Sequence, residues 1–480
     1  MNFQGLYIAA TKRNSGKTTI SIAIMRLLKD KGITVQPFKK GPDFIDPMWL
    51  SLASKRNCYN LDFYFLSKDK VLKHFLEYSV NSDISIIEGN HGLHDSLDIQ
   101  GKSSNASMSK LLGLPVVLVI DVSELNRGVV PLIMGFKKFD EDVNIKGVIL
   151  NKVHNKRHEK NLIKYIKHYT DLKIVGVVPN DQELSIKQRH LGLMSTLSKD
   201  EIEKFIEHIS AKLSGNIDID AIIKISKIAK KINYPDDDLP KKKKILKKGV
   251  KDSLKIGLAY DNAFNFYYNE NIEELKRLGC EIIPFSPLND SNLPDVDALY
   301  IGGGFPELFC KDLDVNISLK SDIREKIEIG LPVYAECGGL MYLCRSIIYD
   351  NVDNVRREMV GIINAEVKLT KKPNGHGYTK LKPVCYDKNS SLWFNKIRII
   401  KGHEFHHSYL EISEDYKPVF AFNVKKGFGV NGLYDGIIYK NVLASYTHIY
   451  SPSEPQWFKS WTIFIKKIKK ITPDCNKIIL

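Results

Sequence analysis

A Gly-Lys-Thr-Thr run near the start of the sequence has the residue types that hold a phosphate group. It closes the segment Thr11–Thr19, which follows an apolar run at Leu6–Ala10 and precedes a helical pattern. A strand, a tight loop and a helix start place backbone N–H groups around a phosphate. Lys17 can then neutralise the β- and γ-phosphates, and the Thr18 hydroxyl can ligate Mg²⁺. The segment therefore predicts a site for ATP and Mg²⁺.

This phosphate loop departs from the usual GxxxxGK[ST] pattern. Thr11 stands where the first glycine is expected, and Lys12 lies five residues before Lys17, where some variant loops carry a second lysine. We expect the nucleotide contacts to come from the loop and from a lysine that follows it: Lys12, Ser15, Gly16, Lys17, Thr18, Thr19 and Lys39.

Acidic residues near the ends of predicted strands are candidates for holding Mg²⁺ and the substrate. Asp43 and Asp46 lie in FKKGPDFIDP, in a segment bracketed by two prolines that we do not expect to be helical throughout. Glu88 ends a buried run, and Asp95 follows it in a loop with two glycines. Mg²⁺ takes oxygen ligands, and doubly wound sheets bind ligands at strand ends. We assign Thr18, Asp43 and Glu88 to the metal, and Asp46 and Asp95 to the substrate.

A second candidate for a reactive residue is Cys337, in the run PVYAECGGLMYL. The run predicts a strand, a sharp turn and a helix, with the thiol at the turn and two glycines behind it. A helix N-terminus favours the thiolate, and the N–H groups that follow can form an oxyanion hole. An isolated cysteine is more often a small buried hydrophobe, but the Glu-Cys-Gly-Gly setting favours a nucleophile.

A cysteine nucleophile needs a base, which need not be near in sequence. Four histidines compete for the role, and their spacing does not choose between them: His403, His406 and His407 in GHEFHHS, and His448 in ASYTHIY. Three glycines after another predicted strand, Gly302–Gly304, are expected to line the same pocket.

The elements that must position these residues alternate along the first half. Continuous apolar strands interleaved with helices indicate a parallel sheet covered on both faces. Predicted strands are Leu6–Ala10, Thr34–Phe38, Ile84–Ile87, Val116–Asp121, Lys146–Leu150 and Ile174–Val178, and predicted helices include Thr18–Lys31, Leu125–Phe136 and His158–Tyr169.

A charged, proline-containing stretch separates this half from a second α/β unit. We expect an ATP-dependent domain at residues 1–230, a linker at 231–253 and a second domain at 254–465. The second domain begins with a strand at Leu254–Ala259 and a helix at Tyr267–Leu278. Strands at Glu281–Phe285, Ala298–Ile301 and Pro332–Glu336 follow, with added short strands from Met359 onward.

Composition and charge exclude several classes of protein. The longest mostly apolar run, Leu111–Ile120, is too short to span a bilayer, and the first residues lack the layout of a secretory signal, so we expect a cytoplasmic protein with no membrane partner. No CxxC pair occurs, which argues against zinc and disulfide frameworks. Part of the net charge of +15 sits in Lys241–Lys251, and we interpret it as compositional bias or as attraction for a polycarboxylate, not as nucleic-acid binding.

These motifs together resemble the cobyrinic acid a,c-diamide synthase family. The matches run in order through the variant phosphate loop, VQPFKKGPDFIDP, IIEGNHGLHD, LYIGGGFPEL, PVYAECGGLMYL, GHEFHHS and ASYTHIY, and they span nearly the whole chain. The resemblance implies a phosphate-loop domain like that of dethiobiotin synthetase, with a parallel sheet. A class I glutamine amidotransferase-like α/β domain would follow it.

The resemblance also implies a division of chemical labour. Cys337 would attack glutamine and release ammonia, and the family's histidine falls on His448. Tyr450 occupies the position of the usual class I glutamate, so the third member of the triad is not identified. ATP would phosphorylate a carboxylate of a tetrapyrrole polycarboxylate, and ammonia would displace the phosphate. A homodimer is compatible with the sequence.

Three alternatives stay open on the sequence. Asn90 resembles members that amidate sirohaem in dissimilatory sulfur metabolism, which we weigh equally with cobyrinate amidation. A ParA/MinD-like ATPase switch fused to an inactive amidotransferase domain would fit Lys12 and the basic surface. Cobyric acid synthase-like amidation would use related parts, but GPDFIDP and FNFYYNEN favour the a,c-diamide branch.

Overall fold

The computed structural model divides the chain into two compact units, Met1–Lys242 and Lys243–Leu480. It describes residues 3–184, 186, 188–189, 192–193, 199–232, 253–349, 355–384, 393–394 and 397–471. Most of the predicted linker, 231–253, and the basic run Lys241–Lys251 lie outside the described residues. No helix in the described part of the chain is long and apolar enough to cross a membrane.

The first unit is built on a seven-stranded sheet in the order β3-β2-β4-β1-β5-β6-β7, in which every neighbouring pair is parallel. The sequence predicted all of these strands except β3, whose three residues are too few to show a pattern. β1, β2 and β5 are buried along their whole length, because helices cover both faces of the sheet. The strands are β1 (Gly5–Ala10), β2 (Val35–Lys40), β3 (Tyr59–Leu61), β4 (Ile84–Glu88), β5 (Val116–Asp121), β6 (Ile145–Val153) and β7 (Lys173–Pro179).

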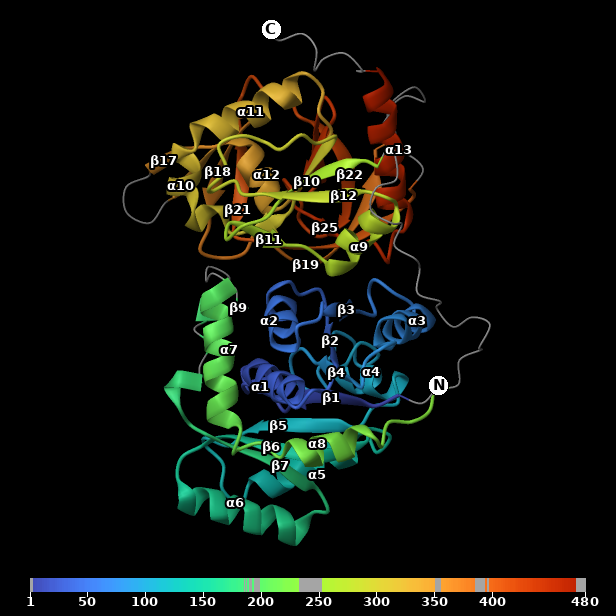
Figure 1. Cartoon of the computed structure of the whole chain (residues 1–480), viewed down its shortest axis with the longest axis vertical. Coiled ribbons are helices and arrows are strands. Elements are labelled where there is room, and N and C mark those ends of the chain that lie inside the picture. The colour runs from blue at the N-terminus through green and yellow to red at the C-terminus, as the bar shows by residue number, and fades with distance from the viewer. Residues whose placement is uncertain are drawn as a thin grey trace. The chain divides into compact units, whose positions relative to one another are not determined.

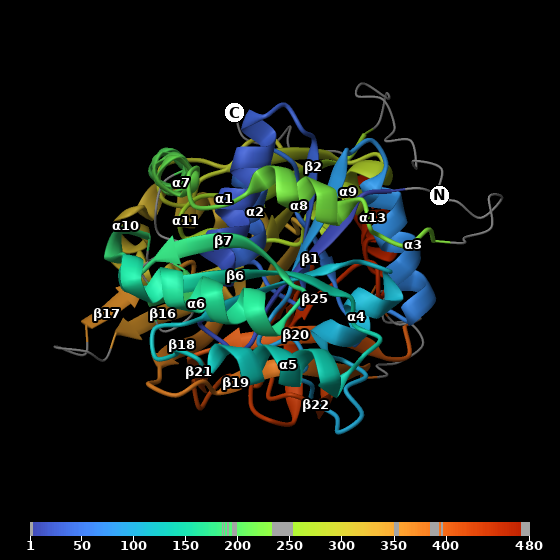
Figure 2. The ribbon, with the colours of Figure 1, turned by 90° about the horizontal axis from the view of Figure 1, so that it is seen from below.

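Helices α1, α2, α7 and α8 share one hydrophobic core on one face of this sheet, and α7 lies beside α1 and α2 (Figure 1, Figure 2). The predicted helix Leu125–Phe136 begins only at Val129, because Asn126–Gly128 turn before it. The helices of this unit are α1 (Lys17–Asp30), α2 (Ile45–Ser54), α3 (Lys68–Ser79), α4 (Asn105–Leu111), α5 (Val129–Phe139), α6 (Lys156–Tyr169), α7 (Lys199–Leu213) and α8 (Ile219–Ser226).

The phosphate loop lies where the strand order of this sheet reverses. β1 pairs with β4 on one side and with β5 on the other, and the chain leaves β1 directly into the loop and α1. Ligands of open α/β sheets bind at the carboxyl ends of strands beside such a switch point. The topology therefore opens a ligand site at the end of β1 and β4.

The second unit is built on a ten-stranded sheet in the order β12-β10-β13-β15-β24-β23-β22-β19-β20-β25. Its first five strands are parallel and the rest pair antiparallel, which confirms the predicted α/β unit with added β structure. These strands are β10 (Lys255–Ala259), β12 (Glu281–Phe285), β13 (Ala298–Ile301), β15 (Val333–Glu336), β19 (Gly375–Pro383), β20 (Ile400–His406), β22 (Val419–Lys426), β23 (Tyr434–Tyr439), β24 (Val442–Ser445) and β25 (His448–Ile449).

Smaller sheets and six helices complete the described part of this unit. The predicted helix Tyr267–Leu278 is shorter than expected, because Phe264–Phe266 forms a strand and Tyr268 caps the helix. The added strands are β11 (Phe264–Phe266), β14 (Gly303–Gly304), β16 (Cys344–Tyr349), β17 (Val355–Glu358), β18 (Ile363–Leu369) and β21 (Ser408–Ile412). The helices are α9 (Asn269–Arg277), α10 (Cys310–Val315), α11 (Ile317–Glu328), α12 (Gly338–Leu343), α13 (Gln456–Ile471) and the 3₁₀ turn η3 (Pro306–Leu308).

Candidate functional site

The loop between β1 and α1 has the backbone shape of a phosphate cradle. Asn14 and Gly16 take positive φ values of 61° and 83°, which turn the chain sharply into α1. The Ser15 hydroxyl donates to the Lys12 carbonyl at 2.9 Å, and the Asn151 amide donates to the Ser15 carbonyl at 2.8 Å. With its carbonyls held in this way, the loop leaves backbone N–H groups for an anion at the start of α1.

Gly16 is the position in this loop that tolerates a side chain least. A Cβ there would lie 2.3 Å from Asn151 Nδ2, and its φ already disfavours any other residue. Such strain costs about 1–3 kcal/mol, so we expect Gly16→Ala to weaken ATP binding about tenfold or more, measured by calorimetry. Gly215→Ala is the matched control, since a Cβ there meets nothing within 4 Å; an equal effect of both changes would contradict the prediction.

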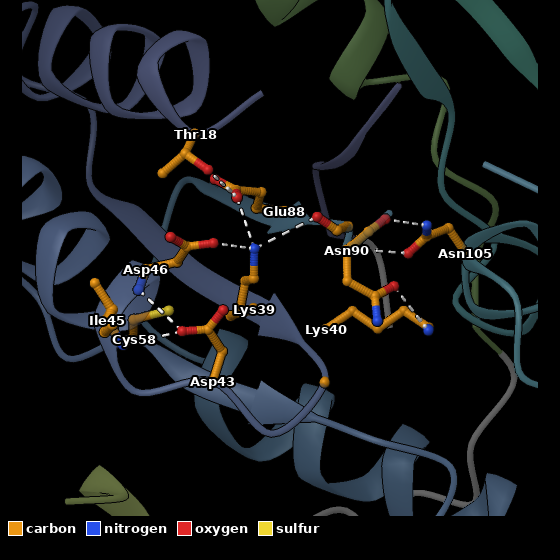
Figure 3. A network of polar contacts seen from close by, with 12 residues as sticks. Thr18, Lys39, Lys40, Asp43, Ile45, Asp46, Cys58, Glu88, Asn90 and Asn105 are labelled. Atoms are coloured by element: carbon orange, nitrogen blue, oxygen red, sulfur yellow. Dashed lines mark hydrogen bonds and ion pairs between the residues drawn. The ribbon is translucent and has the colours of Figure 1, made fainter. Parts of the chain in front are cut away.

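Thr18 and Glu88 present oxygen atoms side by side at the end of β4. The Thr18 hydroxyl donates to Glu88 Oε1 at 2.8 Å, as Figure 3 shows. Glu88 is fully buried, and its Oε2 has no hydrogen-bond partner within the described part of the chain. A buried carboxylate oxygen without a partner, beside a hydroxyl and the phosphate loop, fits Mg²⁺, which binds through one or two carboxylates and substrate phosphates. No cluster of three or more His, Cys, Asp or Glu that could hold a metal by itself occurs among the described residues.

Two buried lysines supply positive charge at this site. Lys17 is 8% exposed, and burial, with the charge of Lys39, lowers its pKa to about 8. Lys39 Nζ lies between Asp46 and Glu88 and donates to Glu88 Oε1 at 2.7 Å (Figure 3). Burial lowers the pKa of Lys39, but the charges of Asp46 and Glu88 outweigh burial and hold it above the usual value. Lys39 therefore stays charged in this site.

Asp43 caps a helix. Asp43 Oδ1 accepts hydrogen bonds from the backbone N–H groups of Ile45 and Asp46 at 2.9 and 3.1 Å. Burial, followed by the charge of Asp46, raises the pKa of Asp43 to about 7. Asp46 lies in the first turn of α2, so the helix begins inside the segment that was expected to be a loop. The structure thus gives Asp43 a capping role and brings Lys39, not a second carboxylate, against Glu88.

Other predicted residues of this site are turned in different directions. The Thr19 hydroxyl donates to the Leu184 carbonyl at 3.3 Å, away from the loop. Asp95 is exposed, and its Oδ2 accepts from the Gly92 N–H at 2.8 Å. Sequence reasoning missed Asn151, which lies in β6 and holds the loop, although its place directly after the predicted strand Lys146–Leu150 was a signal. It also missed Lys40, which donates to Asn90 Oδ1 at 3.1 Å.

Cys337 occupies a strained turn between β15 and α12. Its φ of 48° and ψ of −100° are unusual for a residue with a side chain, and the predicted strand–turn–helix is confirmed. A Cβ on Gly339 would lie 2.2 Å from the Ile301 carbonyl oxygen, so the chain after the thiol packs directly on β13. Such strain at a nucleophile is typical of sharp strand-to-helix turns in hydrolases.

Burial opposes the thiolate form that the helix N-terminus was expected to favour. The Gly338 N–H lowers the pKa of the Cys337 thiol, but burial, followed by the charges of Glu307, Glu336 and Glu404, raises it more. Cys337 is 5% exposed, and α12 has only six residues, so the helix terminus does not compensate for the lost water. The thiol is therefore protonated at rest and needs a base.

Among the four candidate histidines, the structure favours His448. Its Nδ1 lies 3.3 Å from Oε2 of Glu336, the residue directly before Cys337. His403 lies opposite it in the β20–β25 pair, and burial and the charges of His448 and His376 lower the pKa of His403 to about 3. The other two are held by backbone carbonyls: His406 Nδ1 lies 2.8 Å from that of Ser408, and His407 Nδ1 lies 3.3 Å from that of Thr370.

Tyr450, at the position of the usual class I glutamate, faces a different element. It is buried, and its hydroxyl donates to Glu270 Oε1 on α9 at 3.0 Å. The next residue, Ser451, donates its N–H to Asn271 Oδ1 at 2.8 Å. The chain after His448 is thus fixed to α9.

The triple-glycine loop packs against His448 and against the residue that follows Cys337. A Cβ on Gly303 would lie 2.4 Å from His448 Cε1, and one on Gly338 would lie 3.1 Å from the Gly304 backbone nitrogen. Because Gly303→Ala must displace the imidazole, we expect it to lower the glutamine-dependent rate about 100-fold. The ammonium-dependent rate, measured in the same product assay, is expected to stay unchanged. An unchanged glutamine-dependent rate in a folded variant would show that His448 is not the base.

Comparisons with known proteins agree with both halves of this geometry. Residues 6–193 match the model of the CobQ/CobB/MinD/ParA nucleotide binding domain, and residues 255–455 match that of the CobB/CobQ-like glutamine amidotransferase domain. The chain is similar to a protein of Magnetococcus marinus named cobyrinate a,c-diamide synthase, at 40% identity over 94% of this chain and 95% of the relative.

Two archaeal proteins with the same name match over a similar extent. The Methanobrevibacter smithii protein is 39% identical over 96% of this chain and 99% of its own length. The Archaeoglobus fulgidus protein is 38% identical over 98% of each chain. The similarity therefore covers both units.

Proposed function

Because the chain belongs to the cobyrinate a,c-diamide synthase family, we propose that it converts the a and c side-chain carboxylates of cobyrinic acid into carboxamides. The reaction consumes ATP and takes its nitrogen from glutamine. The observation that carries the proposal is the presence, in one chain, of a phosphate loop with a buried lysine and a strained cysteine turn with a histidine.

The first unit activates the substrate carboxylate. A carboxylate is a poor electrophile, and phosphorylation by ATP gives it a leaving group. The backbone of Lys12 and Ser15–Thr19 cradles the phosphates, while the ammonium groups of Lys17 and Lys39 face the charge that develops on them. Thr18 and Glu88 would hold Mg²⁺, which neutralises phosphate oxygens when bound. Asp46 and Asp95, whose charges act on Lys17, would contact the substrate.

The second unit releases ammonia. His448 Nε2 takes the thiol proton as Cys337 Sγ attacks the carboxamide carbon of glutamine. The Gly338 N–H, which faces the Cys337 sulfur, donates a hydrogen bond to the oxyanion of the tetrahedral intermediate. His448 then returns the proton to the departing ammonia, and water hydrolyses the remaining thioester to glutamate with the same base.

A product assay with defined substrates tests the proposal. Purified protein is incubated with ATP, Mg²⁺ and glutamine, and with either cobyrinic acid or sirohaem, and mass spectrometry follows the exchange of each OH for NH₂. We expect two amides on cobyrinic acid and none on sirohaem. Amidation of sirohaem alone would place the enzyme with the sirohaem branch. ATP hydrolysis without amidation of either acid would favour a nucleotide-dependent switch.

A further inference from the structure

His448 is oriented by a carboxylate that precedes the nucleophile in the sequence. A base in a nucleophilic site is held in the correct tautomer by a third group, usually a carboxylate on the far ring nitrogen. Tyr450 cannot be that group, since it has no carboxylate and its hydroxyl contacts Glu270. The carboxylate that faces His448 Nδ1 belongs to Glu336, at 3.3 Å.

Glu336 is surrounded by hydrogen-bond donors. Its side chain is 1% exposed. Its Oε2 accepts from the Tyr300 hydroxyl at 3.1 Å and faces His448 Nδ1, while its Oε1 accepts from the Ile449 N–H at 3.1 Å and from the Tyr334 hydroxyl. Burial, followed by the charge of Glu336, raises the pKa of Tyr334 well above its usual value, so this hydroxyl remains a donor.

The donor set decides which group can stand at this position. A carboxylate only accepts, so it satisfies both tyrosines, the Ile449 N–H and the His448 Nδ1–H at the same time. An amide would turn an NH₂ group toward at least one of these donors. The carboxylate therefore favours the tautomer in which His448 Nδ1 carries the proton and Nε2 is left as the base.

We propose that Glu336 is the positioning residue of the glutaminase, so that consecutive residues supply the orienting carboxylate and the nucleophile Cys337. This inference rests on the proposed function. The strand pairings make it feasible, because β15 pairs with β24, and the turn after β24 brings His448 back to the end of β15. Ile449, the residue after His448, is tied to the same carboxylate.

Glu336→Gln tests the role by kinetics. We expect the kcat for glutamate release from glutamine to fall by on the order of 10²–10⁴-fold, with KM for glutamine little changed, because Glu336 acts through His448 and not on the substrate. The matched control is Glu270→Gln, which changes a buried glutamate bonded to Tyr450 and should leave kcat within about twofold. An equal kcat in wild type and Glu336→Gln would overturn the inference.

The pH dependence of thiol alkylation separates orientation from a merely structural role. The rate of iodoacetamide attack on Cys337, followed by mass spectrometry of its peptide, reports how readily the thiol gives its proton to His448. Besides Glu336, the described charged or titratable groups around Cys337 and His448 include Glu307, Glu404, His403 and Tyr446, and Glu336→Gln leaves all of them in place. We expect the variant to lose about tenfold in alkylation rate at neutral pH and to regain it only in alkaline solution. An unchanged pH profile in a folded variant would contradict the proposal.

Nuclear magnetic resonance of the wild type keeps the inference testable if the variant does not fold. In protein labelled with ¹⁵N-histidine, the His448 signals are identified by their loss in His448→Gln. We expect the neutral ring to carry its proton on Nδ1, and a proton on Nε2 would overturn the inference. The tautomer is measured without turnover, so it decides the role of Glu336 by itself. A wild-type protein that is inactive in the product assay would count against the proposed function instead.

Discussion

Replacing Cys337 by alanine is expected to abolish amidation with glutamine and to leave amidation with ammonium intact. Cys337 is the only group in the proposed reaction that bonds to glutamine, and its turn belongs to the second unit. Loss of a nucleophile costs on the order of 10⁴-fold or more in rate. The proposed activation of the carboxylate takes place at the phosphate loop of the first unit, which the substitution does not touch. The measurement is product formation with each nitrogen source, followed by mass spectrometry.

Cys344→Ala is the matched control for this prediction. Cys344, directly after α12, is also buried, and its thiol donates to the Leu340 carbonyl. The loss of a buried sulfur seven residues further on should leave both nitrogen sources usable. If Cys337→Ala were folded and lost the ammonium-dependent rate as well, the division of chemistry between the two units would be wrong.

Replacing Lys17 by alanine is expected to remove amidation with both nitrogen sources. The Lys17 side chain is buried beside Glu88 and Lys39, so the substitution removes a positive charge from a buried site. In the proposed reaction its ammonium group faces the charge that develops on the phosphates, and loss of such a contact costs about 10²–10³-fold in rate. The measurement is ADP release and amide formation with glutamine and with ammonium.

Lys31→Ala is the control for Lys17. Lys31 lies at the other end of α1, where its side chain is about half exposed and contacts Asp220 at the surface. Exposed pairs of this kind contribute about 0–1 kcal/mol, so both rates should stay close to wild type. Amide formation retained in Lys17→Ala would refute the assignment of the phosphate loop.

The fold was predictable wherever a helix or strand left a regular pattern of apolar residues in the sequence. The strands at Val116–Asp121 and Ala298–Ile301 were predicted with the bounds that the structure shows, because both are continuous apolar runs that end at polar or glycine residues. The start of α5 was not predictable, because Asn126–Gly128 fit a helical period while their backbone forms turns. β3 is too short to leave a pattern.

Site residues that lie together in one short run of the sequence could be predicted. Contacts between residues that only strand pairing brings together could not. The phosphate loop and the Cys337 turn each lie within one short run. Lys39 reaches Glu88 only because β2 lies beside β4, and His448 reaches Glu336 through the turn after β24. The raised pKa of the Cys337 thiol was not predictable, because the sequence does not show that the thiol is buried or that three carboxylates act on it.

The coupling between the two units is tested most directly with two isotopes in one reaction. Cobyrinic acid labelled with ¹⁸O in its carboxylates is incubated with ATP, Mg²⁺ and glutamine labelled with ¹⁵N in its amide. If ATP phosphorylates the carboxylate and Cys337 supplies the ammonia, each new amide carries ¹⁵N, and each inorganic phosphate released carries one ¹⁸O. Amide formation with phosphate that contains no ¹⁸O would contradict activation of the carboxylate through an acyl phosphate.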